Sequence, residues 1–108
     1  MALKHAEPMD VIDLNASGAP LGTHVSSSLL KSRQLQLMRV VLPAGRVLPE
    51  HHVPGEITIQ CLSGKADVLA SGRASQLVPG SLVMLSAAEP HGVRAHDDTV
   101  LLVTVVHS

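Results

Sequence analysis

Residues 55–64 read Gly-Glu-Ile-Thr-Ile-Gln-Cys-Leu-Ser-Gly, a short segment of alternating polar and apolar residues with a glycine at each end. Ile57, Ile59 and Cys61 recur at every second position, and side chains two residues apart point to the same face of a β-strand. Polar residues occupy the positions between them. The segment therefore predicts a half-buried strand at 56–62 that is bounded by turns.

Short apolar runs between turn signals continue along the rest of the chain. The turns are rich in Gly, Pro and Ser, and the runs are rich in Val, Leu and Ile. This rhythm is typical of an all-β sandwich or barrel, and no segment has the apolar spacing of an amphipathic helix. The expected strands are 10–14, 25–31, 34–42, 56–62, 65–70, 73–78, 82–86, 92–96 and 99–106, with a hairpin turn at Ser71-Gly72.

Length and composition restrict the possible partners. The 108 residues suffice for one domain, expected at 9–108 behind a loose tail at 1–8. The formal net charge of -1 provides no basic surface for nucleic acid, and the absence of Phe, Trp and Tyr excludes stacking on aromatic rings. The core must be aliphatic, built from 33 Leu, Val and Ile residues.

The number of cysteines and the hydropathy of the chain indicate the cellular compartment. Cys61 is the single cysteine, so no internal disulfide can form, and we expect it to be a small buried core residue. The first ten residues contain no apolar signal segment, and the longest apolar stretch, 100–106, is too short to span a bilayer. The sequence predicts a cytoplasmic protein without a membrane partner.

Histidine placement marks the candidate site. His51 and His52 are adjacent and follow a segment rich in Pro and Gly, whereas His91 lies forty residues further on, after Glu89-Pro90. Of the other histidines, we expect His5, His24, His96 and His107 to be exposed.

The segment around His51 resembles the first motif of the small single-domain cupins of the RmlC-like jelly-roll superfamily. Gly45, His51 and Gly64 match that motif in identity and spacing. Val53 and Ile57 stand where the family has a second His and a Glu.

The second motif of the family is matched in spacing at 80–95, where Gly80 and His91 keep their identity. The resemblance covers residues 34–106 and implies a double-stranded β-helix, or jelly roll, of two packed antiparallel sheets with little or no helix. It also implies a homodimer and a divalent metal (Fe, Mn, Ni, Zn or Cu) held by imidazoles and a carboxylate. No nucleotide, flavin or haem is implied.

Two registers of the first motif are open. In one, His51, Val53, Ile57 and His91 line the mouth of the barrel, and only two of the family's metal ligands remain. The apolar faces of the predicted strand at 56–62 favour this register.

In the other register, a bulge at 53–55 turns His52, Glu56 and Gln60 inward. The metal ligands are then drawn from His51, His52, Glu56 and His91, with Glu56 as a ligand or general base. The three polar residues are separated by even numbers of positions, so on a strand they would share one face, and this favours the second register.

Three functions remain open from the sequence. The first is a metal-dependent enzyme of dioxygenase, isomerase or lyase type that acts on a small molecule. The second is a metal-free cupin that binds or senses a small molecule, and the third is a structural dimeric partner of another protein. The expected pocket residues are His51, Val53, Ile57, Gln60, Met84 and His91.

Overall fold

The computed structural model describes residues 5–14 and 26–107, and nine β-strands form the framework of that part of the chain. Within these ranges there is no helix of the length and apolarity that a membrane crossing requires. The strands are β1 (Ser27–Lys31), β2 (Leu35–Leu42), β3 (Val47–His51), β4 (Ile57–Ser63), β5 (Ala66–Ala70), β6 (Arg73–Leu77), β7 (Leu82–Leu85), β8 (His91–Ala95) and β9 (Thr99–Val106).

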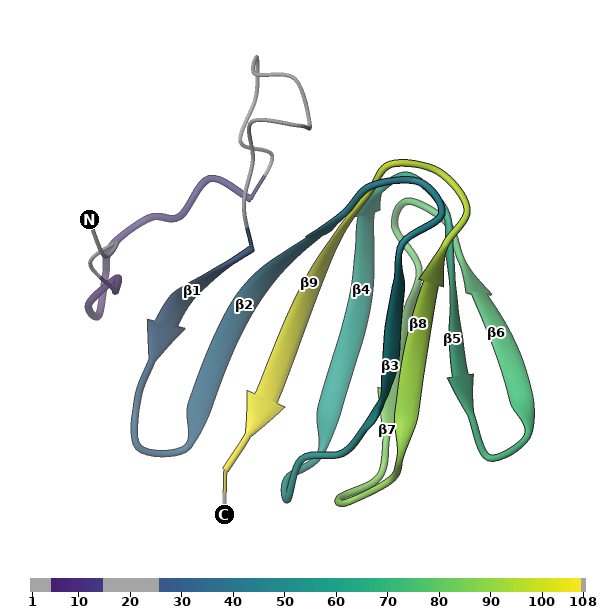
Figure 1. Cartoon of the computed structure of the whole chain (residues 1–108). Coiled ribbons are helices and arrows are strands. Elements are labelled where there is room, and N and C mark those ends of the chain that lie inside the picture. The colour runs from purple at the N-terminus through teal and green to yellow at the C-terminus, as the bar shows by residue number, and fades with distance from the viewer. Residues whose placement is uncertain (1–4, 15–25, 108) are drawn as a thin grey trace.

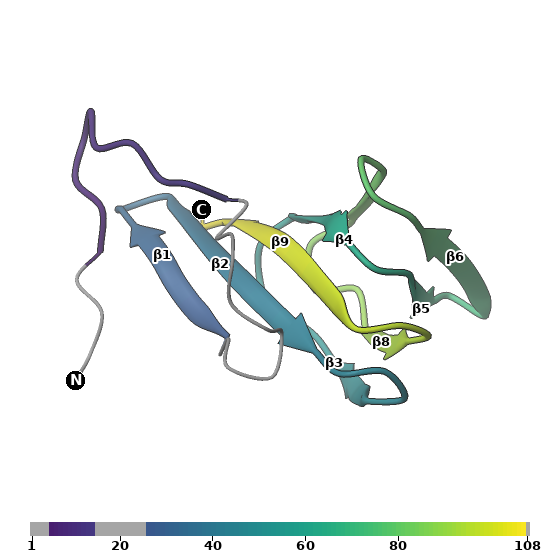
Figure 2. The same ribbon diagram turned by 90° about the horizontal axis from the view of Figure 1, so that it is seen from above.

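The strands form two antiparallel sheets that pack through a common core. The larger sheet has the order β1-β2-β9-β4-β7, and the smaller has the order β3-β8-β5-β6. Figure 1 shows β9 in the middle of the larger sheet, and Figure 2 shows β1 and β6 at opposite ends of the molecule. Two packed antiparallel sheets, with no helix in residues 5–14 and 26–107, confirm the predicted all-β jelly-roll barrel.

The core between the sheets is aliphatic, as the composition predicts. Ile57, Ile59 and Cys61 of β4 are buried on one face of the larger sheet, and they meet Val68 and Val93 of the smaller sheet. Cys61 is a free thiol in this core, and its burial raises the pKa of the thiol above the ordinary value. The alternation at 55–64 thus identified the inner face of β4.

The predicted strand at 10–14 is wrong. These residues form no strand: the Asp10 carboxylate accepts a hydrogen bond from the Glu7 backbone N–H at 2.8 Å, and the Val11 side chain is 96% exposed. An apolar run without a neighbouring strand to pair with cannot remain extended in a sheet.

The structure adds a strand that the sequence did not predict. β3 contains Pro49, which cannot donate to a ladder hydrogen bond, so its sequence does not resemble that of a strand. β3 is tolerated because it is an edge strand that pairs only with β8, with a register shift between Leu48 and His51.

Residues 5–8 contact the first strand. The Ala6 N–H donates to the Leu29 carbonyl at 3.0 Å, and His5 Nε2 lies 2.9 Å from Ser28 Oγ. The rest of the segment predicted as a tail, residues 1–4, lies outside the described residues, as does His24.

The hairpin of β5 and β6 is confirmed. Its turn consists of Ser71 and Gly72, whose φ angles are +53° and +72°. Positive φ at both central residues matches the type I′ turn that suits the twist of antiparallel strands. The turn places Arg73 directly opposite Ala70 at the start of β6.

Candidate functional site

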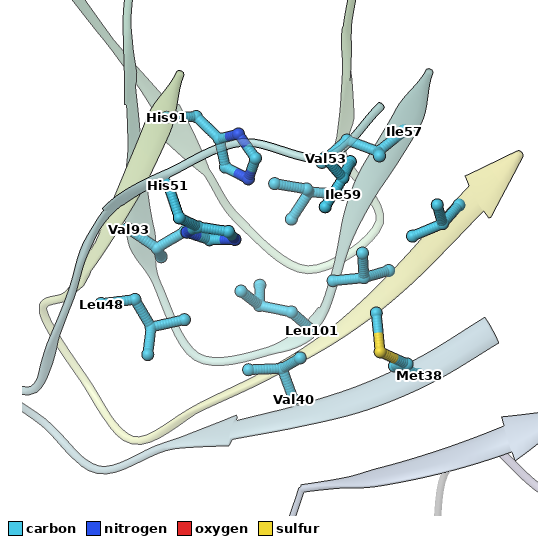
Figure 3. A pocket seen from close by; sticks show the side chains of 12 residues that line it. Met38, Val40, Leu48, His51, Val53, Ile57, Ile59, His91, Val93 and Leu101 are labelled. Carbon is cyan, nitrogen blue, oxygen red and sulfur yellow. The ribbon is translucent and has the colours of Figure 1, made fainter. Parts of the chain in front are cut away.

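A cavity of about 90 Å³ lies between the two sheets (Figure 3). Most of its wall is aliphatic, and two histidines provide its polar side chains. The lining residues are Met38, Val40, Leu48, His51, Val53, Ile57, Ile59, His91, Val93, Leu101, Val103 and Val105.

His51 and His91 come from neighbouring strands of the smaller sheet. They face each other across β3 and β8, and their ring centroids are 4.4 Å apart with the planes tilted by 53°. His91 is 3% exposed, whereas His51 is exposed at the end of its strand. Figure 3 shows both rings on the same side of the cavity, pointing toward the aliphatic wall.

The backbone fixes which nitrogen each imidazole presents. His51 Nδ1 lies 3.2 Å from the carbonyl oxygen of Pro49, and His91 Nδ1 lies 3.1 Å from that of Glu89. A carbonyl oxygen only accepts hydrogen bonds, so each Nδ1 carries the proton. In the neutral ring, Nε2 then has a free lone pair. The site can therefore offer two nitrogen acceptors side by side.

The structure brings His51, Val53, Ile57 and His91 together around this cavity. Val53 follows β3, and its carbonyl accepts a hydrogen bond from the Ala88 N–H at 2.9 Å, which holds the segment against the loop before β8. Ile57 begins β4 and points inward with the rest of its buried face. The arrangement corresponds to the first of the two registers.

His52 and Glu56 lie outside the cavity. Both are exposed, and neither is among the lining residues. Glu56 directly precedes Ile57, so the alternation that points Ile57 inward points Glu56 away. Its carbonyl accepts a hydrogen bond from the Val106 N–H, which ties the start of β4 to β9. This position does not suit a general base for a molecule in the cavity.

Gln60 and Met84, expected in the pocket, do not line it. Gln60 alternates with buried Ile59 and faces the outer side of the larger sheet, where its register partners are Leu82 and Leu102. Met84 lies on β7 and is 60% exposed. The strand period of two explains why both side chains point away from the cavity.

The remaining lining residues were not predicted as pocket residues. Leu101, Val103 and Val105 of β9 line the cavity. They are two residues apart and so share one face of a strand that is apolar on both faces. Because both faces are apolar, the alternation of side chains alone does not tell which face meets a cavity. The pairing of β9 with β4, where Val103 lies opposite Ile59, would have identified it.

The side chains present do not fit the metal site that the family resemblance implies. Within residues 5–14 and 26–107, no three or more His, Cys, Asp or Glu side chains gather into a metal-binding group. The cavity supplies two imidazoles, whereas a catalytic zinc takes three protein ligands and a non-haem iron takes two His and a carboxylate. Val53 and Ile57 occupy the two positions from which the missing ligands would come.

His96 belongs to a separate cluster on the outer face of the smaller sheet. Its Nε2 donates to the Asp67 carboxylate at 2.9 Å, and Arg94 approaches the same oxygen at 3.4 Å. The hydrogen bond from His96 is the main cause that lowers the pKa of Asp67, and the bond from Arg94 adds to it.

Solved structures share this architecture. A conserved protein of unknown function from Streptococcus pyogenes is 22% identical, with a TM-score of 0.80 over 100% of this chain and 96% of that one. A cupin superfamily protein from Desulfitobacterium hafniense is 17% identical, with a TM-score of 0.80 over 100% and 99%. A DMSP lyase from Ruegeria pomeroyi is 23% identical, with a TM-score of 0.70 over 91% of this chain and 55% of that one.

At these identities, the similar structures show a shared fold, and they include both enzymes and proteins of unknown function. No functionally curated protein matches the sequence. The sequence of residues 38–107, from within β2 to just beyond β9, matches the model of the cupin domain family. This match spans well over half of the chain, and the chain belongs to the cupin family.

Proposed function

We propose that this cupin binds a small aliphatic molecule in the His51–His91 cavity and does so without a catalytic metal. The observation that carries the proposal is the lining: ten aliphatic or methionine side chains and two imidazoles. An apolar wall favours the apolar part of a ligand, and a few polar groups fix its orientation.

The two imidazoles indicate which polar group the ligand carries. Their Nδ1 protons are held by the carbonyls of Pro49 and Glu89, so Nε2 is the nitrogen left to accept a hydrogen bond. A hydroxyl or a primary amide can donate to these nitrogens, and an amide NH₂ has two protons for two acceptors. The volume of about 90 Å³ is far below that of drug-sized sites, so the ligand has few non-hydrogen atoms.

Titration calorimetry with isobutyramide, isobutanol and isobutyrate tests this proposal. We expect the amide and the alcohol to bind and the carboxylate, which has no proton to donate, to bind more weakly. His51→Leu fills the position with an apolar side chain and removes one acceptor, and we expect it to weaken the binding of the amide about tenfold. His52→Leu is the matched control, because His52 is exposed and outside the cavity.

Three results would overturn the proposal. The first is that none of the three compounds binds saturably, and the second is that wild type and His51→Leu bind the amide equally. The third concerns metal: after supplementation with Fe, Mn, Ni, Zn and Cu, we expect elemental analysis to find well under one equivalent. A full equivalent that is lost in the His51→Ala, His91→Ala double variant would favour the metal-dependent enzyme.

A further inference from the structure

A second groove, of about 310 Å³, lies between the free edges of the two sheets. β6 ends the smaller sheet and β7 ends the larger one, and residues of both strands line the groove. It shares no lining residue with the His51–His91 cavity. Its apolar surface comes from Val68, Ala70, Val83, Met84 and Leu85. Val68 and Leu85 are buried, whereas Met84 is exposed at the rim.

Polar side chains stand on the core face of β6 at this groove. The register pairs Arg73 with Ala70, Ser75 with Val68 and Leu77 with Ala66, and paired residues share a face of the sheet. Ala66, Val68 and Leu77 are core residues, so Arg73 and Ser75 lie on the face that is apolar elsewhere. Arg73 is exposed and Ser75 is half-buried, so this end of the face is open to solvent and to a ligand.

The groove also carries two opposite charges that are not paired with each other. Among the described residues, the Arg73 guanidinium forms no ion pair, and it lines the groove together with Glu89. The Glu89 carboxylate accepts hydrogen bonds from Ser71 Oγ at 2.5 Å and the Ser86 N–H at 3.0 Å. These bonds lower the pKa of Glu89 and keep it ionised near neutral pH, while leaving lone pairs free for a further donor.

We propose that this groove binds a free aliphatic amino acid. Arg73 receives the carboxylate, because its planar fork of N–H donors matches a carboxylate. Glu89 receives the ammonium group, and the aliphatic side chain lies against Val68, Val83 and Leu85. Only a zwitterion satisfies both charges, and a simple carboxylate would bring its charge close to that of Glu89.

A ligand series tests the proposal through calorimetry on the full chain. Leucine has both charges and an aliphatic side chain, isocaproate lacks the ammonium group, and isoamylamine lacks the carboxylate. We expect leucine to bind saturably with one site per chain, and each of the other two to bind about tenfold more weakly or worse. Equal binding of all three compounds, or no binding of leucine at millimolar concentration, would overturn the proposal.

Two variants test the assigned residues. Arg73→Gln and Glu89→Gln should each weaken leucine about tenfold, and Gln at 89 can still bond to Ser71 and Ser86. The charge-matched control is Arg33→Gln, in the exposed turn between β1 and β2, which should bind leucine as the wild type does. Thermal unfolding followed by circular dichroism verifies that each variant is folded. Unchanged leucine affinity in Arg73→Gln would overturn the proposal, since that exposed residue can be replaced without loss of the fold.

Discussion

Asp67 is a largely buried carboxylate on the outer face of the smaller sheet, and its side chain is 13% exposed. It is held there by His96 and Arg94, with the stronger contact from His96 at 2.9 Å. Burial alone would raise its pKa, but the hydrogen bond from His96, with the contribution of Arg94, outweighs burial and lowers it. Asp67 therefore links protonation to stability.

The predicted consequence is a loss of stability in acid. The folded pKa of Asp67 is below the ordinary value of 3.8, so the unfolded chain binds more protons just below that value. The stabilisation is therefore complete well above pH 4 and declines as the pH falls through the lowered pKa. Urea unfolding, followed by far-UV circular dichroism from pH 7 to pH 3, measures this slope.

Asp67→Asn is the control for the acid transition. It removes the titrating group, so its free energy of unfolding should depend less on pH in this range than that of the wild type. Part of the slope will remain, because the hydrogen bonds to Glu89 also lower the pKa of that residue. An identical slope in both proteins would show that Asp67 does not contribute.

Single residues of the candidate site were predictable only where a motif identified them. His51 and His91 lie in two segments far apart in the sequence. The resemblance to the cupins predicted that they lie close together, and the structure places them so. Gln60 was expected in the pocket because it is an even number of residues from His52 and Glu56, which would place all three on one face. Glu56 and Gln60 do share a face, but the buried Ile57, Ile59 and Cys61 occupy the opposite face, so the polar face points away from the cavity.

At the scale of elements, two motif glycines with similar backbone angles have different surroundings. Gly64 has φ +87° and Gly45 has φ +83°, a conformation that costs any other residue about 1–2 kcal/mol. A Cβ on Gly64 would collide with the backbone of Asp98 and Thr99, whereas a Cβ on Gly45 would meet nothing within 4 Å. Gly64 is therefore required for the close packing of β4 against the turn before β9.

Gly64→Ala should destabilise the protein by about 2–4 kcal/mol, because it adds a backbone clash to the conformational cost. Gly45→Ala should cost only the conformational part, about 1–2 kcal/mol. Chemical denaturation of the two variants measures the difference. Equal losses would mean that the close approach at Gly64 relaxes without cost.

The strands that the sequence predicted differ from the strand that it did not predict in what stabilises them. Eight of the nine described strands fall on segments that were predicted as strands between turn signals, and most of these segments are apolar or alternate. β3 was missed because its stability comes from its pairing with β8 and not from its own residues, among which Pro49 argues against a strand. Residues 10–14 failed in the opposite way, since their apolar run has no strand to pair with.

At the scale of the whole molecule, the outer face of the larger sheet carries an exposed apolar area on β7. Leu82 is 58% exposed and Met84 is 60% exposed, and their register partners on β4 are Gln60 and Thr58. None of these four side chains is charged, and β7 is the free edge of its sheet. Apolar edges of this kind pair with other chains.

We propose that two copies of the chain associate through this β7 face, in a homodimer of twofold symmetry. Light scattering coupled to size-exclusion chromatography is expected to give twice the chain mass for the wild type and the monomer mass for Met84→Lys. Val47→Lys is the matched control, since Val47 is 49% exposed on β3 of the other sheet. A monomeric wild type, or a dimer that survives Met84→Lys, would contradict this interface.

The central place of β9 has a consequence during synthesis. β9 pairs along its whole length with β2 and also with β4, so it joins two strands that are made much earlier. Until residues 99–106 leave the ribosomal tunnel, β2 and β4 each have an open edge and an uncovered apolar face. A nascent chain in this state presents the surfaces that aggregate or recruit chaperones. Folding of the larger sheet therefore waits for β9.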